Sequence, residues 1–208
     1  THHEALDMDL FLRVAPELYL KKLLVGGFDK VYEINKSFRN EGISTRHNPE
    51  FTMIEVYTAY HDVNDVMDLT EEIVKKTAQS VLGKLTIPYG EKTLDLSRWE
   101  KVSFAGLMKG SFDISPEDET STWVEKLKKK GVKVEGKDLS RTQIINLVAD
   151  LLEPASSAKE EVMRPVFVTD YFAELSPLAR RNPKNPNLSE RFELYIGGME
   201  VANGYSEQ

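Results

Sequence analysis

The chain has 208 residues, of which 40% are hydrophobic and 29% charged, and this composition is typical of an ordinary globular protein. A formal net charge of −7 argues against tight generic binding to nucleic acid, and the absence of cysteine excludes disulfides, thiol catalysis and zinc–thiolate sites. No apolar run of about 18 residues occurs, so we expect no membrane span, and the missing cysteines favour a reducing, cytoplasmic location.

A short helix is predicted near the start of the chain. Pro16-Glu17 is followed by LYLKKLLV and then by Gly26-Gly27. Proline is favoured at the start of a helix and glycine just after its end. We therefore expect a helix between Pro16 and Gly26.

Residues 31–60 are the most informative stretch, because two segments with period-2 alternation flank a polar loop. Alternate residues of a strand point to opposite faces. One side of the first strand carries Glu33, Asn35, Ser37 and Arg39, and one side of the second carries Phe51, Met53, Glu55 and Tyr57. Unpaired buried charges are costly, so charges on one face of a hairpin indicate a site for a charged ligand. The charged residues of this hairpin are Arg39, Glu41, Arg46, His47 and Glu55.

Beyond the hairpin, a helix is predicted that is capped by Asn64 or Asp65. Its apolar residues keep helical spacing as far as Val81, which indicates a side packed into the core rather than a site. Residues 86–96 predict a second hairpin, with its turn near Tyr89-Gly90.

Residues 99–163 differ from the rest of the chain, since charge rises, strand signals fade and amphipathic helices are predicted near 122–130 and 140–152. We interpret this segment as a small helical insertion. It separates residues 1–98 from residues 164–208, which together form the main core. In the second of these parts β-structure resumes, and a last pair of strands turns at Gly197-Gly198.

The overall prediction is an α+β fold. Strands with one polar side alternate with helices of 3.6-residue periodicity. A mainly antiparallel sheet that carries the site on one face, with helices packed behind it, satisfies both patterns.

The hairpin and both ends of the chain resemble a known family. FRNE at residues 38–41, RHNPEF at 46–51 and EVY at 55–57 resemble motif 2 of the class II aminoacyl-tRNA synthetases, in the form found in lysyl-tRNA synthetases. THHEALDMDLFLRVAPELYLKKLLVGGF at the start and ERFELYIGGMEVANGYSE near the end are similar to the same family. The resemblance covers about residues 1–90 and 164–208 well, and the middle only loosely.

The resemblance implies ATP-dependent activation of L-lysine to lysyl-adenylate with Mg²⁺, and transfer of lysine to tRNA(Lys) by a homodimer. Motif 1, the glycine-rich motif 3 and the anticodon-binding OB domain are not in the sequence, so we expect a catalytic-domain fragment with little activity alone. Basic runs at 126–130 and 180–184 are candidate tRNA contacts, although a solvated helix face and a solvated loop are the favoured interpretation. Two other functions stay open: a paralogue that lysylates a protein such as elongation factor P, and a non-catalytic ligand-binding module.

Attack of the lysine carboxylate on the α-phosphorus of ATP requires positioning and charge neutralisation. The resemblance places Arg39 at the α-phosphate, where a guanidinium can bind phosphate oxygens bidentately. It implies that the γ-phosphate end is held by Arg46 and His47, the adenine side by Glu41 and Asn48, and the base stack by Phe51.

Magnesium is implied to bind Glu193 and Glu200, since this ion prefers a few hard oxygen ligands completed by phosphate and water. Glu200 is out of phase with Asn203 for a regular strand, so we expect a β-bulge between them. Met199 stands where the family usually has arginine, which removes a charge near the phosphate site.

The lysine ε-ammonium is costly to desolvate unless carboxylates and hydrogen bonds replace its water. The resemblance implies a lysine pocket of Glu17, Glu55, Tyr57, Asn203, Tyr205 and Glu207. Glu55 is the first choice for the ammonium, with Tyr57 as its hydrogen-bonding neighbour. Glu17 and Asn203 are expected at the α-amino and carboxylate groups. Tyr205, where the family usually has phenylalanine, is expected to cover the stem.

Overall fold

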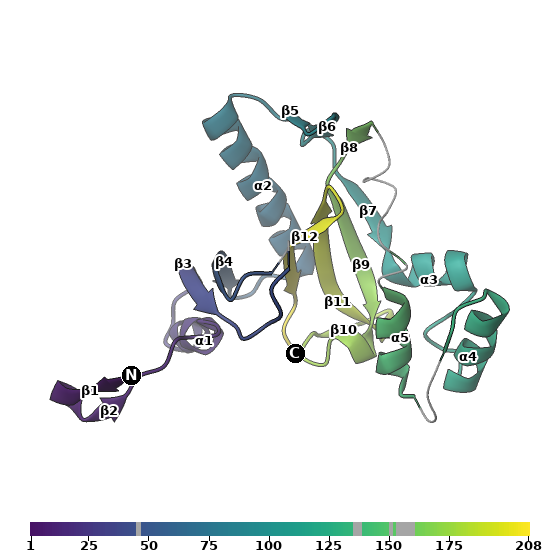
Figure 1. The fold of residues 1–208 in the computed structure, drawn as a ribbon, viewed down its shortest axis with the longest axis horizontal. Helices are drawn as coiled ribbons and strands as arrows, with labels where there is room; N and C mark the ends of the chain where they lie inside the picture. The colour runs from purple at the N-terminus through teal and green to yellow at the C-terminus, as the bar shows by residue number, and fades with distance from the viewer. Residues whose placement is uncertain (45–46, 135–138, 150–151, 153–160) are drawn as a thin grey trace. The chain divides into compact units, whose positions relative to one another are not determined.

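The structure is a computed structural model that describes residues 1–44, 47–134, 139–149, 152 and 161–208. It divides into two compact units, Thr1–His61 and Asp62–Gln208 (Figure 1). Each unit has its own sheets, and each is described by itself below.

The first unit is built around one helix and one hairpin. Its elements are β1 (His2–His3), a 3₁₀ turn (Glu4–Leu6), β2 (Met8–Asp9), α1 (Glu17–Val25), β3 (Lys30–Phe38) and β4 (Glu50–Thr58). Helix α1 begins after Pro16 and ends at Gly26, as predicted. Strands β3 and β4 pair antiparallel from Lys30↔Thr58 to Phe38↔Glu50 without a shift of register, which confirms the two strands around a polar loop.

The two faces of the β3–β4 hairpin differ in an unusual way. Glu33 lies opposite Glu55 and Ser37 opposite Phe51, so the two predicted sides form one polar face. Helix α1 packs against both strands. The other face carries apolar side chains that remain exposed: Tyr32 at 70%, Ile34 at 66% and Ile54 at 46%.

The second unit contains the larger sheet. Its elements are α2 (Val63–Leu82), β5 (Thr86–Tyr89), β6 (Lys92–Asp95), β7 (Glu100–Ser103), α3 (Phe104–Phe112), α4 (Thr120–Lys129), α5 (Arg141–Ala149), β8 (Val162–Met163), β9 (Val166–Phe172), a 3₁₀ turn (Ala173–Leu175), β10 (Arg181–Asn182), β11 (Asn185–Ile196) and β12 (Met199–Tyr205). The main sheet has the order β10-β11-β9-β7, with β12 beside β11, and only the β7–β9 pair in it is parallel. The predicted α+β class with a mainly antiparallel sheet is confirmed.

Apolar clusters cover both faces of the main sheet. Successive residues of β9 alternate between them, so Phe167 packs with α2 while Val166 and Val168 pack with the helices of the opposite face. The α2 cluster is formed by Val63, Met67, Phe167, Phe192 and Leu194. The opposite cluster includes Phe104 and Met108 of α3, Trp123 and Leu127 of α4, and Ile144 and Val148 of α5.

Two local features differ from the sequence-based expectation. Helix α2 is capped by Asp62, not by Asn64 or Asp65. The Asp62 carboxylate accepts hydrogen bonds from the backbone N–H groups of Asn64 and Asp65. The Asp65 carboxylate in turn accepts a hydrogen bond from the backbone N–H of Asp62. This capping box starts the helix at Val63. Strand β7 was not predicted, because four residues are too few to show a period. Helix α3 was not predicted either.

Candidate active site

The polar face of the β3–β4 hairpin places two carboxylates opposite each other. Glu33 and Glu55 are direct partners in the register. A guanidinium nitrogen of Arg13 lies 2.6 Å from Glu33, which neutralises that carboxylate. Glu55 accepts a hydrogen bond of 2.8 Å from the Tyr57 hydroxyl, and among the described residues it forms no ion pair. Glu55 is therefore a half-buried carboxylate, fixed in direction, whose charge is available to a cation.

Helix α1 brings a third acidic residue, Glu17, to this face. Glu17 accepts a 2.6 Å hydrogen bond from the Lys21 ammonium, one helical turn away. The same ammonium lies 5.7 Å from the centroid of the Tyr57 ring. Glu17, Tyr57 and Glu55 are thus linked through Lys21 and the Tyr57 hydroxyl. Lys21 was missed, although its i, i+4 spacing from Glu17 is a recognisable signal for an ion pair.

The loop between β3 and β4, together with Phe51 at the start of β4, carries the residues that the resemblance assigns to ATP. The Arg39 guanidinium lies 5.2 Å from the centroid of the Phe51 ring and donates to the carbonyl of Val14. His47 Nδ1 is 2.9 Å from the Ser44 hydroxyl. Two hydrogen bonds to backbone carbonyls involve the other loop residues. The Asn48 side-chain amide donates to the Glu50 carbonyl, and the Glu41 backbone N–H donates to the Arg39 carbonyl. Arg46 lies outside the described residues.

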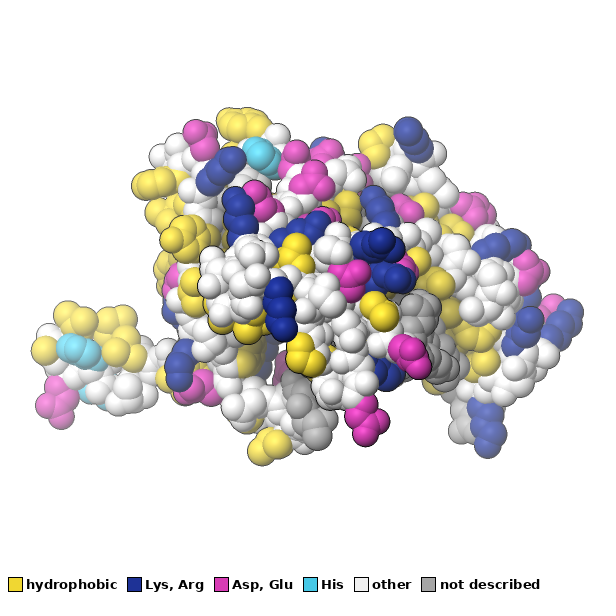
Figure 2. All heavy atoms as spheres, turned by 90° about the horizontal axis from the view of Figure 1, so that it is seen from above, with side chains coloured by type: hydrophobic (Ala, Val, Ile, Leu, Met, Phe, Trp, Pro, Cys, Tyr) yellow, Lys and Arg dark blue, Asp and Glu magenta, His cyan; other side chains and the backbone are white. Residues whose placement is uncertain are grey.

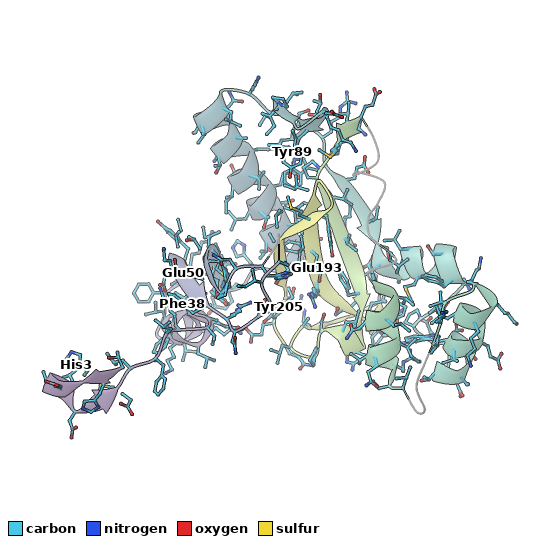
Figure 3. All side chains as sticks on the ribbon, viewed as in Figure 1. His3, Phe38, Glu50, Tyr89, Glu193 and Tyr205 are labelled. Atoms are coloured by element: carbon cyan, nitrogen blue, oxygen red, sulfur yellow. The ribbon has the colours of Figure 1, made fainter. Side chains whose placement is uncertain are left out.

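In the second unit, the β11–β12 hairpin carries four of the remaining predicted residues, of which Figure 3 labels Glu193 and Tyr205; the other two are Glu200 and Asn203. Gly197 and Gly198 connect Ile196 to Met199 with φ of 60° and 79°, values that a two-residue hairpin turn requires and that glycine adopts easily. Tyr195 pairs with Glu200 but Leu194 pairs with Ala202.

Val201 is therefore an extra residue, and the predicted bulge between Glu200 and Asn203 is confirmed. Without it, Glu200 would share the face of Leu194, which packs against α2. With it, Glu200 shares the side of Glu193 and Asn203. The Asn203 amide donates to Glu200 at 3.1 Å.

Glu193 is the centre of a polar network. The hydroxyls of Tyr171 and Tyr195 both donate to its Oε2 atom at 2.7 Å, and Arg191 donates to Oε1 at 2.5 Å. Arg191 also donates to the Ser176 hydroxyl and the Leu175 carbonyl. Of these residues, only Glu193 was predicted from the sequence.

Electrostatics links the two carboxylates. The Glu200 side chain reaches solvent, yet partial desolvation and then the charge of Glu193 raise its pKa. Burial, followed by interactions with Glu193, raises the pKa of Tyr171 and of Tyr195, so both hydroxyls stay protonated as donors. Two carboxylates that repel each other in this way favour a bound cation.

The last two predicted residues lie at the end of the chain. Tyr205 is the register partner of Arg191 on β11, and Glu207 forms an isolated bridge with Ala179. Within the described ranges, no group of three or more acidic or histidine side chains could hold a metal by itself. The described part of the chain also has no helix long and apolar enough to span a membrane.

The basic runs considered for RNA contact are partly neutralised. Lys126 pairs with Asp113 and Asp118, and Arg180 pairs with Glu190. The face drawn in Figure 2 intersperses basic with acidic side chains. The described residues therefore give no added support to a nucleic-acid contact at either run.

All residues from 1 to 208 match the family described as "tRNA synthetases class II (D, K and N)". A lysine–tRNA ligase of Pseudomonas fluorescens is 50% identical over 214 residues, which cover 100% of this chain and 41% of that protein. A lysine–tRNA ligase of Cronobacter sakazakii is 47% identical over 210 residues, with the same coverage of 100% and 41%. The chain thus spans 41% of the length of these relatives.

Proposed function

Because the chain belongs to the class II tRNA synthetases (D, K and N), we propose that it forms part of the catalytic domain of a lysine–tRNA ligase. Such an enzyme activates L-lysine with ATP to lysyl-adenylate and transfers the lysine to tRNA(Lys). The observation that carries the proposal is the pair Glu33 and Glu55, of which only Glu33 is neutralised within the described residues. The names of the relatives, lysine–tRNA ligase, support the same substrate.

Lysine selection follows from the chemistry of Glu55. An ammonium on an apolar stem loses its water on binding, and a carboxylate with a fixed orientation replaces that water well. The Tyr57 hydroxyl fixes Glu55, and Arg13 keeps Glu33 from competing for the substrate. Glu17 and Asn203 are proposed for the α-amino and carboxylate groups, and Tyr205 and Glu207 for the rest of the pocket.

ATP is proposed to bind through the residues of the β3–β4 loop and Phe51 of β4. Arg39 contributes a charge that never deprotonates and that neutralises the α-phosphate as the adenylate forms. Phe51 offers its ring to the base, and the guanidinium of Arg39 already lies against that ring. The adenine side is proposed to contact Glu41 and Asn48. The γ-phosphate end is proposed to contact Arg46 and His47.

Glu193 and Glu200 fit a magnesium ion. Both are oxygen donors on the same side of the β11–β12 hairpin, and partial desolvation, followed by the charge of Glu193, raises the pKa of Glu200. Magnesium is usually bound by one or two carboxylates together with substrate phosphates and water. The ion would neutralise phosphate charge; the protein supplies the two carboxylates and their orientation.

A direct test separates the acceptor substrates. A full-length enzyme carrying this chain is assayed for lysine-dependent ATP–pyrophosphate exchange, and then for transfer of labelled lysine to tRNA(Lys) and to elongation factor P. Exchange together with labelling of tRNA(Lys) supports the proposal. Labelling of the protein alone assigns the chain to a protein-modifying paralogue, and saturable lysine binding without exchange assigns it to a ligand-binding module. We expect the 208-residue chain by itself to give little or no exchange.

A further inference from the structure

The hydrogen bonds around Glu193 differ in number from those around Glu200. An ionised carboxylate has about four acceptor positions. Three of those on Glu193 are filled, by Tyr171, Arg191 and Tyr195. Glu200, on the neighbouring strand, accepts from Asn203. The Glu193 carboxylate is thus fixed by three donors, whereas the Glu200 carboxylate accepts one described hydrogen bond.

The three donors come from two strands of the second unit, β9 and β11. Tyr171 belongs to β9 and is 6% exposed, while Arg191 and Tyr195 flank Glu193 on the same side of β11. Arg191 is itself fixed by Ser176 and the Leu175 carbonyl, and its guanidinium lies 5.2 Å from the Tyr171 ring centroid. The Glu193 carboxylate therefore cannot rotate without breaking hydrogen bonds to residues of two strands, β9 and β11.

An ion pair alone does not explain this arrangement. Glu193 is 12% exposed, and Arg191 by itself would neutralise its charge. Two additional hydroxyl donors on Oε2 add direction rather than charge, and together the three donors leave one acceptor position unused.

We propose that Tyr171, Arg191 and Tyr195 are positioning residues. They hold Glu193 so that its one unused acceptor position meets the metal–nucleotide, while the less restrained Glu200 side chain adjusts its orientation to this ligand. This inference rests on the proposed function, because it takes Mg²⁺·ATP as the ligand of the two carboxylates. The donors touch neither metal nor substrate and act only through Glu193.

The test uses full-length enzyme with Tyr171→Phe, Tyr195→Phe and the double substitution. Tyr89→Phe is the matched control, since Tyr89 lies in the same unit, beside the Gly197 turn, and outside the network. Mn²⁺ binding in the presence of ATP is followed by electron paramagnetic resonance. The Mg²⁺ concentration at half-maximal exchange, the KM for lysine and the melting temperature are measured alongside.

Loss of such supporting hydrogen bonds typically weakens metal affinity by about 10–100-fold. We expect the double variant to weaken Mn²⁺ binding and raise the half-maximal Mg²⁺ concentration by at least ~10-fold, with the KM for lysine unchanged. If the network variants bind Mn²⁺ as Tyr89→Phe does, even with a lower melting temperature, the hydroxyls are structural and the inference is wrong. Should the double variant not fold, the Tyr195→Phe variant decides by the same measurements.

The two proposals fail in different ways. Wild-type exchange combined with unaltered Mn²⁺ binding in the variants overturns the positioning role alone. Weakened Mn²⁺ binding in the variants, without any lysine-dependent exchange by the wild type, overturns the ligase function alone. A wild type that binds no Mn²⁺ with ATP contradicts both.

Discussion

The β3–β4 and β11–β12 hairpins both carry a polar face, but they hold their charged groups differently. In β3–β4 the register is regular and Glu55 has one described hydrogen-bond partner, Tyr57. In β11–β12 a bulge interrupts the register, and Glu193 has three partners drawn from two strands. The Glu55 carboxylate is thus held by one described hydrogen bond, whereas the Glu193 carboxylate is held by three.

The apolar sides differ as well. Phe192 and Leu194 of β11 are fully buried against α2, whereas Ile34 and Ile54 of β3–β4 are exposed. Among the described residues of the first unit, the buried apolar side chains are Leu20 and Pro16. Substitutions in the β3–β4 hairpin should therefore change ligand binding with little effect on stability. Substitutions on the buried side of the β11–β12 hairpin should lower stability with little effect on ligand binding.

The largest effect that this comparison predicts is on lysine binding by Glu55→Gln. Glutamine keeps the shape and the hydrogen bond but leaves the bound ammonium without a countercharge, at a cost of roughly 3–5 kcal/mol. Calorimetry of the full-length enzyme should show greatly weakened lysine binding, nearly unchanged ATP binding and poorer discrimination against norleucine. Glu33→Gln is the matched control, since Arg13 already neutralises that residue. If lysine affinity survives within about threefold, another carboxylate pairs with the ammonium, and Glu207 is next in line.

The next effect concerns catalysis. Arg39→Ala should lower kcat/KM for lysine-dependent exchange at least ~100-fold, because losing one preorganised donor to a developing oxyanion typically costs about 3–4 kcal/mol. The melting temperature should barely change, since Arg39 is exposed. A loss below about fivefold would show that Arg39 does not contact the reacting phosphate.

A smaller effect, on stability, is expected behind the second hairpin. A Cβ on Gly204 would lie 2.7 Å from Cε1 of the buried Phe192 ring and 3.4 Å from Val66. Gly204→Ala should therefore lower the free energy of unfolding by about 1–3 kcal/mol, as overpacking does. Gly110→Ala in α3 is the matched control: its Cβ meets nothing within 4 Å, and alanine there should add about 0.5–1 kcal/mol. Equal melting temperatures for the two variants would contradict the tight packing of β12 on β11.

The smallest effect concerns the capping box of α2. Asp62→Ala should cost about 0.5–2 kcal/mol, and Asp62→Asn much less, because asparagine also caps. The N–H groups of Asn64 and Asp65 lower the pKa of Asp62, so its charged form is favoured in the folded protein. That stabilisation is present at neutral pH and is lost as pH falls through the depressed pKa, below the usual carboxyl range. Urea unfolding of both variants at neutral and acidic pH should show a weaker acid dependence than the wild type.

Local patterns predicted the parts of the fold that are regular. The β3–β4 faces follow from strict alternation, because no bulge interrupts either strand. The bulge at Val201 could be anticipated from the odd spacing of Glu200 and Asn203, together with the roles that the resemblance gave them. Helix α1 followed from the proline and glycine at its ends.

Contacts between distant residues could not be predicted in this way. Asp170 has a φ of 55°, which breaks the alternation of β9 and lets Tyr171 join the cluster of Val168 and donate to Glu193. Aspartate adopts the left-handed region more readily than most residues, but nothing else in the local sequence singles out this position. The Arg13–Glu33 ion pair likewise depends on how the segment before α1 returns to β3, which no periodicity encodes.

The junction of α2 with the last strand has a consequence for the order of folding during synthesis. The N–H of Val63 donates to the Ser206 hydroxyl at 2.9 Å, across 143 positions of the chain. Helix α2 is complete at Leu82 and β12 at Tyr205. At about 5–20 residues per second, the strand leaves the ribosome roughly 6–25 s after the helix. During that interval Val63 and Met67 have no β11 to pack against, so the nascent helix presents an apolar stripe that chaperones can bind until its distant partners are made.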